Sequence, residues 1–156
     1  MRKAITLMFL GSFVLIGLAG NAAADEKSQV TYEKNVKPII AARCLSCHGS
    51  DAPAISEFKK DKEGFKKKMK GPRMDSYETL IIFVRGDESG ALMRRLDDGK
   101  KKADGKPGNM YVWLGKTDSE RAENLSLMKK WVGGWTLKRK EEMTEEEKKA
   151  IKAPEK

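Results

Sequence analysis

The spacing of apolar residues along the chain predicts helices, and no stretch shows the alternation typical of strands. Between Thr31 and Arg43, apolar side chains recur three and four residues apart, which places them on one face of a helix. Pro38 is tolerated only in a first turn, so we expect the regular helix to begin near Asn35, with residues 31–34 as a lead-in turn. The apolar stripe of this first helix consists of Tyr32, Val36, Ile39 and Ile40.

The middle of the chain is expected to hold two short helices. The first opens at residues 75–77 and ends at Gly86, where glycine supplies a left-handed stop. The second runs from about Ser89 to Leu96. Residues 49–73 combine glycines and prolines with a dense run of lysines, so they are expected to form a loop or a short irregular helix.

The last long helix is predicted to run from Thr117 to about Val132. Thr117 and Glu120 form a capping box, in which each residue satisfies the other's end of the helix. The tail, residues 137–156, is mostly charged and has a second capping box at 144–147. Its apolar content predicts a short terminal helix without firm docking.

The N-terminus has the pattern of a secretory signal peptide. Arg2 and Lys3 precede an apolar run over residues 4–19, and small residues lead up to a cleavage site after about Ala24. A periplasmic location is therefore expected. The predicted organisation is a signal peptide at 1–24, one domain at 25–136 and a charged tail at 137–156.

The charge of the exported chain limits its partners. Cleavage removes Arg2 and Lys3 from the 32 basic side chains and none of the 23 acidic ones, so the formal charge falls from +9 to +7. This basic surface favours an acidic partner. Nucleic acid is not expected, because the chain is exported and its lysines are not interleaved with aromatic residues. Membrane contact is expected to be peripheral at most.

The segment from Cys44 to His48 carries the candidate chemistry. It uses both cysteines and the single histidine of the chain in the pattern Cys-x-x-Cys-His. This spacing is typical of covalent c-type haem attachment. On one helical turn, both sulfurs can bond the porphyrin edge while the imidazole points at the iron. We therefore predict one covalent haem c on Cys44 and Cys47, with His48 as an iron ligand.

A redox dithiol, a zinc site and a structural disulfide fit this motif less well. A thioredoxin-like dithiol needs a strand-helix-strand context, whereas the flanks here are helical and charged. A zinc site would need a distant carboxylate as its fourth ligand. A disulfide between Cys44 and Cys47 would close only a tiny loop and would leave His48 unexplained.

The sixth ligand of the iron is less constrained by the residues alone. Without a second histidine, it must be a methionine, a lysine, a terminus or an exogenous group. Met93 and Met128 sit in core-like helical stripes, and Met69 and Met74 bracket the basic run. Met110 lies in a glycine-rich loop shortly before the last helix.

The order of these motifs resembles that of class I cytochromes c. The haem motif and Gly49 come first, and Ser76-Tyr77 begins the next helix. The turn at 86–89 follows, then Met110, and a final helix that ends in Trp131. The resemblance spans residues 32–134 and implies an all-α fold of about four helices around one haem. It also implies Met110 as the second axial ligand, although the family usually has proline after this methionine and the present chain has Tyr111.

The function implied is transfer of one electron between redox partner proteins, with no catalytic residue and no small-molecule substrate. Tyr77, Leu80 and Leu92 are candidates to wall the haem. The alternatives are a haem enzyme or gas sensor with an open sixth position, where Arg73 or Arg85 would act, and a haem subunit of a larger respiratory complex.

Overall fold

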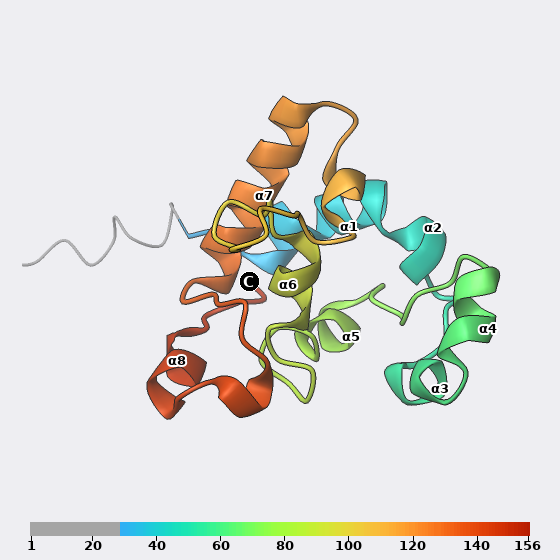
Figure 1. The fold of residues 1–156 in the computed structure, drawn as a ribbon. Coiled ribbons are helices and arrows are strands. Elements are labelled where there is room, and N and C mark those ends of the chain that lie inside the picture. The colour runs from blue at the N-terminus through green and yellow to red at the C-terminus, as the bar shows by residue number, and fades with distance from the viewer. Residues whose placement is uncertain (1–28) are drawn as a thin grey trace, which may run out of the picture.

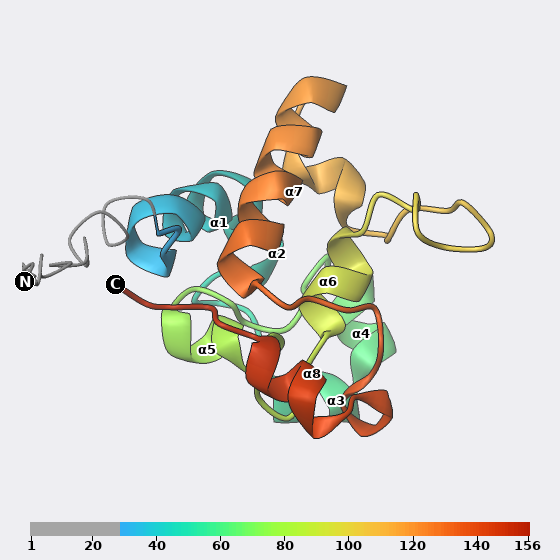
Figure 2. The ribbon, with the colours of Figure 1, turned by 90° about the vertical axis from the view of Figure 1, so that its left-hand side faces the viewer.

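The computed structural model describes residues 29–156, so the predicted signal peptide at 1–24 lies outside the described residues. The described part is helical, and the all-α prediction is confirmed (Figures 1 and 2). No helix within 29–156 has the length and apolar character needed to cross a bilayer. The elements are η1 (Tyr32–Val36), α1 (Lys37–Arg43), α2 (Leu45–His48), α3 (Ile55–Lys60), α4 (Lys62–Lys67), α5 (Tyr77–Ile81), α6 (Ala91–Leu96), η2 (Tyr111–Leu114), α7 (Asp118–Val132), η3 (Lys140–Glu142) and α8 (Glu145–Ala150).

The first predicted helix is divided by its proline. The Thr31 side chain caps η1, a π-helical turn, by accepting a hydrogen bond from the Lys34 amide at 3.3 Å. Helix α1 then begins at Lys37, with Pro38 in its first turn, where the missing N–H has no partner to lose. The expected lead-in turn is therefore present, and the regular helix begins two residues later than predicted.

The core forms where the final helix α7 packs on η1. Trp131 and Met128 of α7 are fully buried, and the Trp131 ring lies 6.2 Å from that of Tyr32. The Tyr32 ring in turn meets Tyr77 of α5 edge-on at 5.4 Å. Aromatic pairs of this kind stabilise a core beyond their buried area. Leu80 is buried in the same cluster, so the predicted stripes of three helices do converge.

The middle helices are shorter than predicted. Helix α5 starts at the expected cap, because the Ser76 side chain accepts from the Thr79 amide, but it ends at Ile81 rather than near Gly86. The prediction of a left-handed stop at Gly86 is wrong, because the glycine with positive φ here is Gly90, just before α6. Residues 55–67 form the two short helices α3 and α4.

Helix α7 begins at its predicted cap, but the capping box is only half made. The Thr117 side chain accepts from the Glu120 amide at 3.2 Å, as expected. The Glu120 carboxylate instead accepts from the Lys116 amide at 2.7 Å and pairs with Arg43 at the end of α1. The predicted reciprocal bond to Thr117 is therefore replaced by a tertiary contact that ties α7 to α1.

The tail is firmly docked, so the prediction of a loose tail is wrong. Ile151 and Ala153 are buried, and Ile151 pairs with Gly133 after α7. The carbonyl of Pro154 accepts from the indole N–H of Trp131 at 2.8 Å and from the Tyr32 amide at 2.9 Å. Three buried apolar residues, Met143, Ile151 and Ala153, and a few backbone groups are enough for this docking.

Candidate functional site

The haem motif lies on one helical turn directly after α1. The Cys44 amide donates to the Ile40 carbonyl at 2.8 Å and so continues α1. The Cys44 carbonyl then accepts from the Cys47 amide at 3.2 Å and the His48 amide at 2.9 Å. Cys44, Cys47 and His48 therefore lie within one turn, and the two thiols are not joined in a disulfide.

The His48 ring is held by the loop that returns to the motif at residues 70–74. Its Nδ1 lies 2.6 Å from the Pro72 carbonyl oxygen. Because a carbonyl can only accept, Nδ1 carries the proton and Nε2 keeps its lone pair. The same loop is tied to the motif by the backbone, since the Gly71 amide donates to Cys47 and the Met74 amide donates to His48, both at 2.9 Å.

Gly71 leaves room for the imidazole. A Cβ at this position would overlap Cε1, Nδ1 and Nε2 of the His48 ring. Only glycine therefore lets the backbone lie against the face of the ring. The sequence identifies Gly71 and Pro72 only as turn residues and gives no sign of this role, because a pairing across 24 residues leaves no local signal.

Burial favours the neutral forms of Cys44 and His48. Desolvation, with a smaller contribution from Cys47, raises the pKa of Cys44 to about 11. Burial also lowers the pKa of His48, and the hydrogen bond to Pro72 only partly opposes this shift. A neutral imidazole with a free Nε2 is the form that ligates iron.

The residues present therefore fit a covalent haem. Two free thiols share one turn, and the imidazole is oriented by a carbonyl in the way that metal-bound histidines usually are. Gly71 gives the ring its space. Cys44 and Cys47 would hold the group by thioether bonds, and His48 would face the iron.

Met110 follows a loop whose two ends are joined by hydrogen bonds to Asp97. The buried Asp97 side chain accepts from the Gly99 amide at 2.9 Å, and its backbone carbonyl accepts from Gly108 at 2.7 Å. The Met110 amide then donates to Arg95 at 2.9 Å, and its half-buried side chain packs against the core. Asp97 does not stand out in the sequence, where it is one of several polar residues in a loop.

The turn η2, which follows Met110, packs on α1, α6 and α7. The Leu114 carbonyl at its end accepts from the Asn124 side chain of α7 at 2.7 Å. Met110 is thus attached to a turn that touches α1, the helix leading into Cys44. Its role as an iron ligand stays a prediction.

The other methionines have different surroundings. Met93, Met128 and Met143 are buried in the core, as expected for the first two, whereas Met69 is 69 % exposed. The backbone of Met74 is bonded to His48, which places this residue on the His48 side of the motif. Leu80 and Leu92, two of the predicted haem-wall residues, are buried, and the Tyr77 hydroxyl donates to the Ala153 carbonyl at 3.0 Å.

Comparison with known proteins identifies the family. The model of the PccH cytochrome c family matches residues 31–154. The chain belongs to the PccH cytochrome c family. The solved structure of the monoheme cytochrome PccH from Geobacter sulfurreducens is 50 % identical, with a TM-score of 0.76 over 81 % of this chain and 98 % of that one. A comparison with curated proteins found no significant match.

Membership of the PccH cytochrome c family establishes the cofactor and the general class of activity. The chain carries one covalently bound haem c with iron, and members of such cytochrome families generally carry electrons. The matched region extends to residue 154 and so includes the docked tail. The predicted boundary at residue 136 marks a change of composition within this region.

Proposed function

We propose that this PccH-family cytochrome is a periplasmic carrier of single electrons. Cys44 and Cys47 would hold its haem, and His48 and Met110 would bind the iron. The iron supplies the chemistry by changing between its ferric and ferrous states. The main support is the His48 ring, which Pro72 and Gly71 hold in one tautomer and one orientation. A fixed ligand suits electron transfer, because the ligand has to move little when the charge of the iron changes.

Met110 is the proposed second ligand. Its side chain is half-buried and packs against the core, at the end of a loop whose backbone is bonded to Asp97 and Arg95. A thioether raises the reduction potential relative to a second imidazole. With both axial positions taken by side chains, no place is left for a substrate, which favours a carrier over an enzyme.

One alternative needs a distal acid or base, and Arg85 is poorly suited to that role. Its guanidinium donates to the Tyr77 hydroxyl at 2.9 Å and to the Lys152 carbonyl at 3.4 Å. These contacts secure the tail. Arg73 is no better suited, because it lies in the loop that holds His48 and its Nε is 3.9 Å from the Asp75 carboxylate.

The partner is proposed to be a redox protein with an acidic face. Helices α3 and α4 form a small hairpin, stacked through Phe58 and Phe65, at one edge of the molecule (Figure 1). Residues 59–70 of this hairpin hold seven lysines against two acidic residues. The Lys70 ammonium donates to the Ser46 carbonyl at 3.4 Å, so the basic hairpin is attached directly to the haem motif.

Optical and redox measurements on the mature, haem-loaded protein test the proposal. We expect a mass increase of one haem, a low-spin spectrum in both oxidation states and a sulfur-to-iron band at the red end of the oxidised spectrum. The reduced protein should not bind carbon monoxide. Rapid binding of carbon monoxide at neutral pH would instead support the open sixth position.

A further inference from the structure

A cavity of about 430 Å³ lies between α7 and the start of the loop that follows α6. This volume is within the range of small-molecule sites, which is about 300 to 1,000 Å³. Neither the haem motif nor Met110 contributes to its lining. The cavity therefore belongs to a separate feature of the molecule, and none of its residues has a part in the proposed electron transfer.

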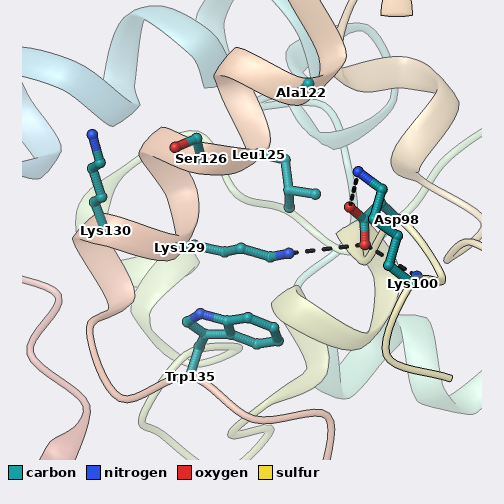
Figure 3. Close-up of a pocket in the computed structure, with 8 residues that line it drawn as sticks. All are labelled: Asp98, Lys100, Ala122, Leu125, Ser126, Lys129, Lys130 and Trp135. Carbon is teal, nitrogen blue, oxygen red and sulfur yellow. Dashed lines mark hydrogen bonds and ion pairs between the residues drawn. The ribbon is translucent and has the colours of Figure 1, made fainter.

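Two lysines of the lining meet at Asp98, and a third lysine, Lys101, lies beside the cavity on the Trp135 ring. Lys100 lies 3.4 Å and Lys129 lies 3.9 Å from the carboxylate of Asp98. Figure 3 shows Lys129 reaching from α7 towards Asp98 above the ring of Trp135. Lys129 lies 4.4 Å and Lys101 lies 4.7 Å from the centre of that ring.

The positive charge at the cavity is only partly balanced. Asp98 is the one carboxylate among the lining residues, set against Lys100, Lys129 and Lys130. Burial opposes its ionisation, but the Lys100 amide and the cations together hold the pKa of Asp98 below its ordinary value, so it is ionised at neutral pH. Two positive charges therefore remain, and the Trp135 ring offsets them only weakly. A ligand with two negative charges would complete the balance.

The rest of the lining selects an organic ligand. Ala122 and Trp135 supply an accessible apolar wall, to which the nearly buried Leu125 adds little, and Ser126 adds a hydroxyl donor. An inorganic anion would neutralise the lysines but leave this wall in contact with water. An organic dianion would cover the wall and meet the ammonium groups at once.

We propose that this cavity, between Lys129 and Trp135 of the α7 end and Asp98 of the facing loop, binds a small organic dianion. Lys100 and Lys129 bind its negative groups, and Lys130 lies at the rim of the site. The carbon skeleton packs against the ring of Trp135.

A nuclear magnetic resonance titration of the haem-loaded protein tests the proposal. The probes are isophthalate, its neutral diamide isophthalamide, and inorganic phosphate. We expect isophthalate to cause saturable shifts at Ser126, Lys129 and the Trp135 indole, at concentrations where the other two probes cause none. Its affinity should fall as salt is raised, because salt screens the lysines.

Two substitutions should change the affinity in opposite directions. Lys129→Gln should weaken isophthalate about three- to tenfold, whereas Asp98→Asn should tighten it by a similar factor, because it removes the competing negative charge. Asparagine keeps the oxygen that accepts from the Lys100 amide at 3.3 Å. Lys149→Gln is the matched control, since Lys149 is exposed and lies outside the cavity, and it should leave the affinity unchanged.

Several outcomes would overturn the proposal. Equal binding of isophthalamide would show that charge is not recognised, and equal binding of phosphate would show that the apolar wall is not used. An equal loss of affinity in Lys129→Gln and Lys149→Gln would show that only the net charge matters. The absence of saturable shifts below 10 mM isophthalate, roughly the weakest affinity of interest at about 3 kcal/mol, would rule out the site.

Discussion

At the scale of single residues, the proposed haem site depends on groups that hold His48 as well as on His48 itself. The Pro72 carbonyl selects the tautomer of His48, and Gly71 provides the space for its ring. Neither residue would touch the iron. Such supporting contacts commonly decide how firmly a metal ligand is oriented.

Gly71→Ala should therefore disturb the haem site. The added Cβ would overlap the His48 ring, so either the ring or the loop has to shift. We expect a loss of about 1 to 3 kcal/mol in the free energy of unfolding, with an altered spectrum of the ferric haem. Urea unfolding and optical spectra of the haem-loaded protein measure both effects.

Gly105→Ala serves as the control for this substitution. Its Cβ would meet nothing within 4 Å, although its φ of +63° makes alanine unfavourable there. It should cost about 1 kcal/mol of stability without changing the spectrum. Identical spectra for Gly71→Ala and the unaltered protein would contradict the role given to Gly71.

Met110→Ala tests the proposed sixth ligand. Removal of the thioether should convert the iron to high spin or recruit a nearby lysine, and it should lower the reduction potential. Met69→Ala is the matched control, because Met69 is exposed and its loss should change neither quantity. If Met110→Ala keeps the native spectrum and potential, Met110 is not the ligand.

At the scale of elements, the docked tail joins three parts of the chain. Pro154 bonds to Trp131 of α7 and to Tyr32 of η1, while Ala153 bonds to Tyr77 of α5. These are the aromatic residues at the centre of the core. The tail therefore closes the open side of a cluster that the helices alone would leave exposed to water.

Deletion of residues 151–156 should destabilise the protein by about 2 to 4 kcal/mol. The loss combines the burial of Ile151 with the hydrogen bonds to Trp131 and Tyr77, less the entropy that the freed tail regains. Deletion of Lys156 alone is the control and should have little effect, because this residue is exposed. Equal urea midpoints for the two deletions would contradict the structural role of the tail.

At the scale of the whole molecule, charge is concentrated on one hairpin. The α3–α4 hairpin lies at an edge and is bonded to the haem motif where it returns to the body of the protein (Figure 1). A basic surface at this position can attract an acidic partner towards the haem. Such attraction acts on the rate of encounter more than on the strength of the final complex.

Replacement of Lys66, Lys67 and Lys68 by glutamine should therefore slow the oxidation of the reduced protein by ferricyanide, an anionic acceptor. Its salt dependence should also become flatter, while the spectrum and potential stay nearly unchanged. The control replaces three exposed lysines of the tail, Lys149, Lys152 and Lys156, and changes the net charge equally. Equal rates and salt slopes for the two triple variants would show that the hairpin lysines have no specific role in attracting the acceptor.

The sequence by itself determined the chemistry and the helical class of this protein. The five residues from Cys44 to His48 are consecutive, so one turn contains the whole motif, and the family comparison confirms the haem. The long helix α7 was also predictable, because its cap at Thr117, its apolar stripe and its glycine stop are all local signals.

Only the tertiary structure decided the features that join distant parts of the chain. Pro72 meets His48, Glu120 meets Arg43, and the tail covers Trp131 through partners that lie 23 to 77 residues away in sequence. The tail was misjudged because its charged composition hides the three apolar residues and the backbone groups that do the docking. A pattern along the chain reports which side of a helix is apolar, whereas the packing of all the helices determines what covers that side.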